Sequence, residues 1–380
     1  MPAARDGVPP RNSAAQFESQ IPIIPFIRTW PSRRTRCKLQ CGGDTKAERR
    51  TISPTRVEAI NPVLSLLACV LIFLCGTLSF AQQAIPVSIV NLSGLKVPEL
   101  TIANFVASYN GKAVQVESAS PDNNGRRIVL LLDVSDSMLG RTSDADWNFP
   151  LDVADHLLAA MPPSTAIGLA AFGTGLEHVM SPTNDRTKLK DEVEVVRKAR
   201  WSFSKHDQAD TSIRDAIIAA AKLFDHPQLG DVLYIITDGI DNTSEANIDD
   251  VYQALACRGI RLFAFVVSAR TQIRFGSATA EGQRTMRELS EDTGGFSFLR
   301  LLPSASPYSS ELVDSRGKPT DLAKQFAFQY RAILGVYRLS VDLPEVHRKR
   351  QDWQLELSGL DTATKNNLAL LYPKKFELCD

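Results

Sequence analysis

Four apolar segments alternate with helical patterns between residues 126 and 335, and this alternation is the feature that most constrains the fold. The segments are residues 128–133, 166–172, 231–237 and 260–267. A strand that is apolar on both faces is typical of a parallel sheet covered by helices on both sides. The pattern therefore predicts an α/β domain over 126–335, built on a doubly wound, mostly parallel, Rossmann-like sheet.

The segments between these strands carry the spacing and the end signals of helices. Ala154, Leu157, Leu158 and Met161 recur at helical intervals, and two prolines follow them. Further helices are expected over residues 185–200, 212–224, 248–259, 282–295 and about 320–331. A short edge strand is expected at 176–180, and the segment 296–301 is expected to be the last strand of the domain.

The flanks of this domain have the alternation of half-buried β-strands. In the lead-in, residues 84–125, an Asn110-Gly111 pair between two strand-like runs predicts a hairpin. In the C-terminal extension, residues 336–380, apolar and polar residues alternate over 337–343 and again over 353–357. The two flanks are therefore expected to build a small accessory β-rich region.

The N-terminal part has the composition of a targeting segment. Residues 1–60 carry eleven Lys and Arg against five Asp and Glu, and residues 62–81 carry no charge. We interpret 57–81 as a signal peptide, because small residues stand at Ser79 and Ala81; a retained membrane anchor is the alternative. Residues 1–56 are interpreted as a disordered basic extension, or as the result of a start codon assigned too far upstream.

This organisation predicts an exported protein: periplasmic, on the cell surface or secreted, with a membrane contact only through 62–81 if that segment is uncleaved. The basic excess is confined to the start of a chain with no net charge, which argues against nucleic-acid binding. A mature chain would keep two of the six cysteines, Cys257 and Cys379. They are too few for a disulfide framework, and whether they pair is left open.

Oxygen-bearing side chains follow the ends of two of the apolar strands. Asp133, Ser135 and Ser137 follow the first of them, in "DVSDSM", and Asp238 follows the third, in "TDG". Thr211 opens a helix whose preceding loop can reach the same edge of the sheet, where doubly wound folds bind ligands. Two carboxylates and three hydroxyls suit a hard cation, which predicts a Mg²⁺ site, with Mn²⁺ or Ca²⁺ as alternatives.

At these residues the chain resembles the von Willebrand factor type A family. The family's metal-ion-dependent adhesion site is Asp-x-Ser-x-Ser, then a Thr, then an Asp before Gly, and the five residues named above match it in order. The flanking segments "NGKAVQVESAS" and "QYRAILGVY" further resemble exported bacterial, acidobacterial-type members. The resemblance implies a protein-binding or adhesion module in which the metal captures a Glu or Asp carboxylate of another protein.

Two departures from the family pattern concern the loop after the first strand. Asp136 stands between the serines, where glycine is common, and is expected to face solvent. Met138, Leu139 and Gly140 occupy places where a second, regulatory metal site would need acidic residues, so no such site is expected. Asp215 and Asp241 are expected to be helix and turn residues rather than ligands, and the histidines share no spacing suited to zinc.

Two other functions stay open beside a binding role. A Mg²⁺-dependent phosphohydrolase could use Asp133 as its nucleophile, but Ser135 stands where a second acid would be needed, and no phosphate loop follows the strand. A serine hydrolase motif is also absent from the sequence. A domain that binds its partner through another surface is the second alternative. We therefore expect that the protein is not an enzyme.

Overall fold

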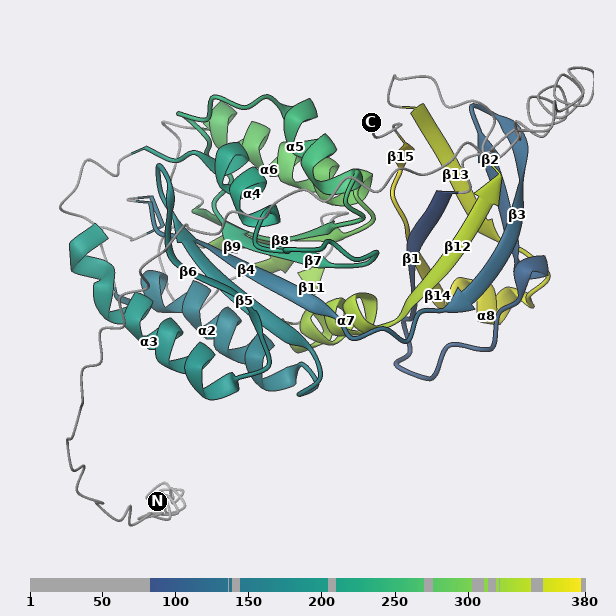
Figure 1. The fold of residues 1–380 in the computed structure, drawn as a ribbon, viewed down its shortest axis with the longest axis horizontal. Coiled ribbons are helices and arrows are strands. Elements are labelled where there is room, and N and C mark those ends of the chain that lie inside the picture. Colours follow the sequence, from purple (N-terminus) through teal and green to yellow (C-terminus); the bar gives the residue numbers. More distant parts are fainter. Residues whose placement is uncertain are drawn as a thin grey trace, which may run out of the picture. The chain divides into compact units, whose positions relative to one another are not determined.

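The structure, a computed structural model, describes the chain from residue 83 onward in segments. The described residues are 83–135, 137–138, 144–203, 210–269, 276–302, 311–313, 319–320, 322–342 and 351–376. Within them the chain forms one eight-stranded mixed sheet and one seven-stranded antiparallel sheet (Figure 1). The predicted extension 1–56 and signal segment 57–81 lie outside these ranges. No described helix is long and apolar enough to cross a membrane.

The eight-stranded sheet is built mainly from the apolar segments that the sequence predicts as strands. Its order is β11-β10-β9-β8-β7-β4-β5-β6, and the pairs from β9 to β5 are parallel. The strands are β4 (Arg127–Asp133), β5 (Ala166–Phe172), β6 (Leu176–Thr183), β7 (Val232–Thr237), β8 (Arg261–Ala269), β9 (Phe296–Leu302), β10 (Glu311–Val313) and β11 (Pro319–Thr320).

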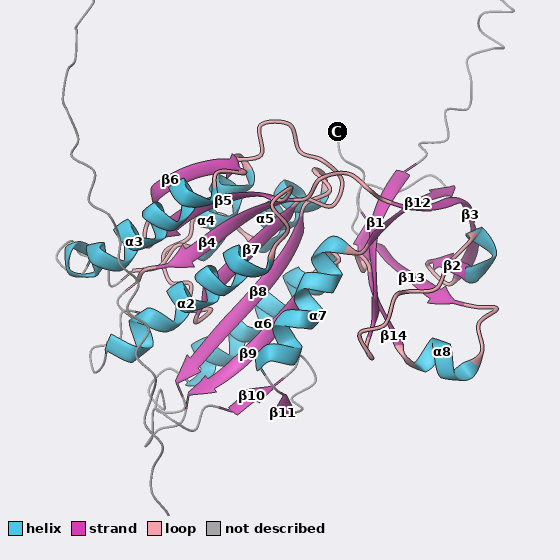
Figure 2. Ribbon diagram, turned by 90° about the horizontal axis from the view of Figure 1, so that it is seen from below, coloured by secondary structure: helices cyan, strands magenta, loops and turns pink. Residues whose placement is uncertain are grey.

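Helices cover both faces of this sheet, as the apolar strands require. The helices are α2 (Asp144–Ala160), α3 (Arg186–Phe203), α4 (Ile213–Ala221), α5 (Ile248–Ala256), α6 (Gly276–Asp292) and α7 (Leu322–Leu334). One face packs against α2, α3 and α7, which lie in front in Figure 2, and the other packs against α4, α5 and α6. The sheet thus has the doubly wound architecture of a Rossmann-like domain.

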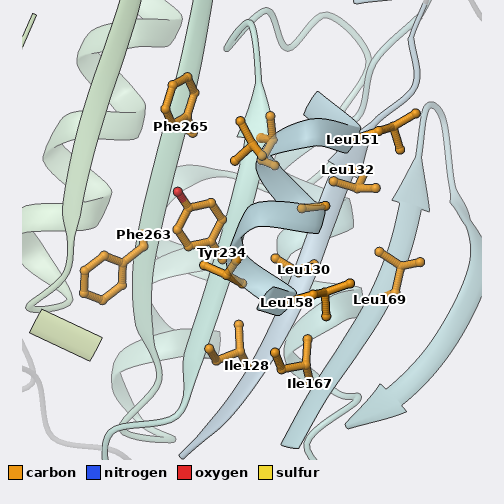
Figure 3. Packing of buried hydrophobic residues seen from close by; sticks show 14 of the residues in the cluster. Ile128, Leu130, Leu132, Leu151, Leu158, Ile167, Leu169, Tyr234, Phe263 and Phe265 are labelled. Carbon is orange, nitrogen blue, oxygen red and sulfur yellow. The ribbon is translucent and has the colours of Figure 1, made fainter. Parts of the chain in front are cut away.

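Strand β4 shows why both faces must be covered. Ile128, Leu130 and Leu132 point to the α2 side, where Figure 3 shows them among Tyr234, Phe263 and other core side chains. Val129 and Leu131 point to the opposite core, because successive side chains in a strand alternate between faces. All five are at most 1% exposed. Burying a side chain of this size contributes roughly 1.5–3 kcal/mol.

The edges of the sheet correct one prediction. The segment 296–301 was expected to be the last strand of the domain, but β10 and β11 follow β9 and extend the sheet by two short antiparallel strands. The strands have only three and two residues, too few for an alternation pattern to reveal them. At the opposite edge β6 is antiparallel to β5.

The flanks form the seven-stranded antiparallel sheet, with the order β14-β1-β12-β3-β2-β13-β15. Its strands are β1 (Gln83–Asn91), β2 (Phe105–Tyr109), β3 (Lys112–Pro121), β12 (Val336–Asp342), β13 (Gln351–Leu357), β14 (Leu368–Leu371) and β15 (Lys375–Phe376). A 3₁₀ helix, Ile102–Asn104, precedes β2, and a short helix α8 (Thr362–Asn366) precedes β14. The sheet has its own core, in which Trp353 and Leu339 are buried.

The lead-in hairpin lies between the two C-terminal strands. Strand β3 pairs with β12, and β2 pairs with β13, so the alternating C-terminal segments are not neighbours. The hairpin turn uses Asn110 and Gly111 with φ of 48° and 73°. Positive φ at both central residues is the requirement that Asn-Gly meets in two-residue hairpin turns.

A buried arginine joins the two sheets. Arg261, at the start of β8 and 0% exposed, donates hydrogen bonds to the Ser88 hydroxyl on β1 and to the Gly230 carbonyl. It also donates to the carbonyls of Ala332 and Ile333 in the last turn of α7. Burial lowers the pKa of this guanidinium to about 9. The side chain therefore connects the seven-stranded sheet, α7 and the eight-stranded sheet.

Candidate metal site

Asp133 is the last residue of β4, and its carboxylate lies beside β7. The parallel register pairs Leu132 with Ile236, so the next residues, Asp133 and Thr237, are adjacent. The Thr237 hydroxyl donates a 2.6 Å hydrogen bond to Asp133 Oδ2. Both residues are 0% exposed. The strand pairing alone thus fixes the position of one predicted ligand.

The loop that follows β4 brings two hydroxyls next to this carboxylate. The backbone N–H of Ser135 donates to Asp133 Oδ1 at 3.0 Å, which turns the chain directly after the strand. The Ser135 and Ser137 hydroxyl oxygens lie 3.0 Å apart. Ser135 is buried, whereas Ser137 is exposed. The two serines therefore present a pair of oxygens that reaches from the interior to the surface.

Asp238 follows β7 and supplies the second carboxylate. Its Oδ1 accepts a 2.9 Å hydrogen bond from the backbone N–H of Ile240, while its Oδ2 is buried without a hydrogen-bond partner among the described residues. The next residue, Gly239, has φ of 82° and donates its N–H to the Thr237 hydroxyl at 3.0 Å. The turn at Gly239 directs the Asp238 side chain back toward the end of the sheet.

Thr211 enters from a third loop, held in place by backbone contacts. Its N–H donates to Asn242 Oδ1 at 2.6 Å, and its carbonyl accepts from the Asn242 N–H at 3.1 Å. The next N–H, that of Ser212, donates to the carbonyl of Gly173 just past β5. Thr211 is 2% exposed. The loop is thereby fastened to the ends of β5 and β7, the two neighbours of β4.

Ionisation of both carboxylates is unfavourable. Burial and, after it, the negative charge of Asp238 raise the pKa of Asp133 to about 7, against hydrogen bonds from Ser135 and Thr237 that lower it. Burial also raises the pKa of Asp238, and the Ile240 amide and the Ser137 hydroxyl oppose this. No salt bridge to either carboxylate occurs in the described part of the chain. The pair therefore lacks a countercharge from these residues.

The donor set fits a hard divalent cation. Two carboxylates and the hydroxyls of Ser135, Ser137 and Thr211 are all oxygen donors, the kind that Mg²⁺ and Ca²⁺ take. Across the described segments there is no cluster of three or more His, Cys, Asp or Glu, the set that a zinc site would need. The unpartnered Oδ2 of Asp238 is a free acceptor at this point.

The acidic residues that were not expected to be metal ligands have other partners in the structure. Asp215 accepts from the N–H groups of Glu245 and Ala246, and Asp241 accepts from Arg214 and Ser244. These bonds fasten α4 to the loop after β7. Met138 is 5% exposed and apolar. Asp136, Leu139 and Gly140 lie outside the described residues, so the expected orientation of Asp136 remains a prediction.

None of the interactions given for the described histidines involves the predicted ligands. His178 lies 3.2 Å from Glu192, between β6 and α3. The ring of His156 packs against Phe326 on α7, with centroids 4.4 Å apart. His206 and His347 are outside the described ranges.

Two residues that the sequence did not single out support the site. Thr237 bridges the Asp133 carboxylate and the Gly239 amide, and Asn242 binds both backbone groups of Thr211. Thr237 had a sequence signal, because it stands in the "TDG" segment directly after a strand of known direction. Asn242 had none, since its role depends on the approach of a loop 31 residues away.

Comparisons with known proteins agree on the central domain. Residues 128–299 match the family described as "von Willebrand factor type A domain". The matched range begins in β4 and ends in β9, so it holds all five predicted ligands. No curated protein matches the chain.

Several solved structures are similar to part of the chain. BatB, a conserved hypothetical protein from Bacteroides thetaiotaomicron, is 20% identical over 55% of this chain and 85% of its own, with a TM-score of 0.31. An aerotolerance-related membrane protein from Bacteroides fragilis has the same identity and TM-score, with 88% of its chain covered. Proximal thread matrix protein 1 from the mussel byssus is 18% identical over 40% of this chain and 38% of its own, with a TM-score of 0.30.

Proposed function

We propose that the protein is a metal-dependent protein-binding module, because residues 128–299 match the von Willebrand factor type A domain family. Domains of this family are generally interaction modules rather than enzymes. The observation that carries the metal dependence is the buried Asp133–Asp238 pair, in which Asp238 Oδ2 has no partner within the described segments. A buried carboxylate oxygen without a hydrogen bond, in a pair of carboxylates without a countercharge from the described residues, is costly, and a bound cation would remove that cost.

The five oxygen-bearing residues have distinct tasks in this proposal. The hydroxyls of Ser135 and Ser137 would hold Mg²⁺ directly, the Thr211 hydroxyl would hold it directly or through water, and the carboxylates of Asp133 and Asp238 would hold it largely through water. A bound Mg²⁺ supplies an electrophilic position that takes a carboxylate from an Asp or Glu of the partner. Ser137 lies on the exposed side of the set, which leaves an approach from solvent. Because few of the direct ligands would be charged, the cation would keep enough positive charge to attract an external anion.

Export is part of the proposal. The charge-free run over 62–81 is the sequence basis for it. Cys257, the one cysteine within the described segments, is disulfide-bonded. Disulfides persist in oxidising compartments and are rare in the cytosol of mesophiles. A module that binds other proteins outside the cytoplasm is consistent with both observations.

Metal binding is tested first, with Mn²⁺ as the probe. Titration followed by electron paramagnetic resonance should show one bound Mn²⁺ per chain, displaced by Mg²⁺, because only free Mn²⁺ gives the sharp six-line signal. The double variant Ser135→Ala/Ser137→Ala should lose this binding. The matched control is Ser118→Ala/Ser120→Ala, which removes two exposed serines at the same spacing on β3 and should bind Mn²⁺ as the wild type does. Equal binding by both double variants would refute the site.

Partner capture is tested separately. Proteins from an envelope fraction that bind the immobilised chain in Mg²⁺ and elute with a chelator should be absent when the Ser135→Ala/Ser137→Ala variant is used. If Mn²⁺ binds and captured proteins are insensitive to chelator, the domain uses another surface, and the proposed role of the metal in partner binding is wrong.

A further inference from the structure

A cavity of about 730 Å³ lies beside α7, next to the core of the large sheet. Its walls come from α7, β9, the segment after β1, α8 and β14. Phe326 and Ile333 of α7 are buried in that core, and Phe328 packs against it. Phe328 also lines the cavity, together with Lys324, Gln325 and Arg331. A volume of several hundred Å³ is typical of sites for small organic ligands.

One wall of the cavity is aromatic. The Phe296 ring lies 4.7 Å from the Phe298 ring and 5.1 Å from the Phe328 ring, measured between centroids. Leu368 and Leu370 of β14 continue the apolar lining. Exposing such an apolar wall to water is unfavourable, so the wall favours contact with the apolar body of a ligand.

Two cations of α7 stand at the same cavity without an acidic partner among the described residues. Neither Lys324 nor Arg331 forms a salt bridge within the described segments, and Arg331 Nε is buried without a hydrogen bond. Arg331 lies under the segment after β1, since a Cβ added to Gly94 would be 3.1 Å from its Nη1. A guanidinium with free donors is suited to bind a carboxylate in a bidentate manner.

Gln325 is the independent sign of a ligand. Its side chain is only 3% exposed, lines the cavity, and has neither its amide nitrogen nor its amide oxygen hydrogen-bonded to any described residue. Leaving such a buried amide unpaired destabilises the fold, and an apolar residue of similar size would avoid that cost. Polar groups of this kind in an apolar pocket commonly orient a ligand.

We infer that this cavity binds an amphipathic carboxylate, with its apolar body on the phenylalanine wall and its carboxylate on Arg331 and Gln325. Lys324 adds positive charge to the same region. The site shares no residue with the metal site, so the two kinds of binding are separate. The ligand class follows from the combination of an aromatic wall with two cations and one amide that have no partner among the described residues.

Isothermal titration calorimetry of the full chain with decanoate tests the inference. Decyltrimethylammonium is the matched probe, because it has the same chain and the opposite charge. Decanoate should bind at one site, at least tenfold more tightly than decyltrimethylammonium, and a chelator should not change its affinity. The absence of decanoate binding, or equal binding of the two probes, would overturn the inference.

Two variants connect any binding to this cavity. Arg331→Met should weaken decanoate binding at least tenfold, since hydrogen bonds to charged groups are strong. Arg284→Met removes an exposed arginine of α6 and should leave binding unchanged. Gln325→Leu should raise the melting temperature of the unliganded protein while weakening decanoate binding. A lower melting temperature together with unaltered binding would show that Gln325 serves the fold instead, and unaltered binding by Arg331→Met would place decanoate elsewhere.

Discussion

The substitution Thr237→Val isolates the contact that positions Asp133, the first of the proposed metal ligands. Valine has nearly the shape of threonine, so the change leaves no cavity at this fully buried position. It removes the hydroxyl that donates to Asp133 Oδ2 at 2.6 Å and accepts from the Gly239 N–H at 3.0 Å. Hence the effect on stability reports the loss of two hydrogen bonds rather than a loss of packing.

The expected cost follows from these two bonds. A hydrogen bond to a charged group contributes roughly 1.5–3 kcal/mol, and an unpaired buried amide costs roughly 1–3 kcal/mol. Without metal at pH 8, where Asp133 is mostly ionised, the free energy of unfolding should fall by about 4 kcal/mol. At pH 5.5 Asp133 is mostly protonated, because its pKa is raised to about 7, and the loss should be about 2 kcal/mol.

Urea unfolding followed by far-ultraviolet circular dichroism, with chelator present at both pH values, measures these costs. Thr237→Ser is the control, because it keeps the hydroxyl and loses one methyl group. A difference between the valine and serine variants below about 1 kcal/mol at pH 8, or the same difference at both pH values, would refute the argument that the hydroxyl stabilises an ionised Asp133.

Four further outcomes are expected. Affinity for Mn²⁺ should fall about tenfold from pH 8 to pH 6, because the raised pKa of Asp133 makes the metal compete with a proton. With a chelator in place of metal, the protonated Asp133 stabilises the fold, and this contribution is lost as the pH rises through about 7, which melting temperatures measured across this pH range can check. Arg261→Met should lower the free energy of unfolding by about 3–5 kcal/mol in urea, since four oxygen acceptors lose a buried donor. Peptide mapping without reductant should join Cys257 to Cys379, the one other cysteine left if export removes the chain through residue 81. An aryl phosphate with Mg²⁺ should show no turnover; turnover that Asp133→Ala abolishes would instead support a phosphohydrolase.

The large sheet could be predicted from the sequence because its strands carry their own signal. Residues 128–133 are apolar on both faces, and Asp133 ends that run, so its place at the sheet's edge needed no structure. Asp238 was placed in the same way. The hydroxyls followed as neighbours in sequence, or as a helix start in the case of Thr211. These are local properties of the chain, and local patterns are read reliably.

What could not be predicted depends on pairing between distant segments. The position of β2 and β3 between β12 and β13 joins residues more than 200 apart, and no alternation pattern specifies it. The bond from Thr237 to Asp133 depends on the register of two strands 104 residues apart. The unpaired amide of Gln325 was equally hidden, since its helical pattern shows an amphipathic helix and gives no sign of a second buried face.

The Asp133–Asp238 pair is better explained by the proposed cation than by a contribution to the stability of the fold. Apart from Asp133, the described side chains of β4 and β7 that face the helices are apolar or aromatic, with two exceptions: Arg127 at the beginning of β4 and Thr237 at the end of β7. An apolar pair at positions 133 and 238 would avoid both the desolvation of two carboxylates and their repulsion. The chain instead carries that cost and adds hydroxyls from Ser135 and Thr237 that lower the pKa of Asp133. Groups that keep a buried carboxylate ionised make sense where a cation binds it.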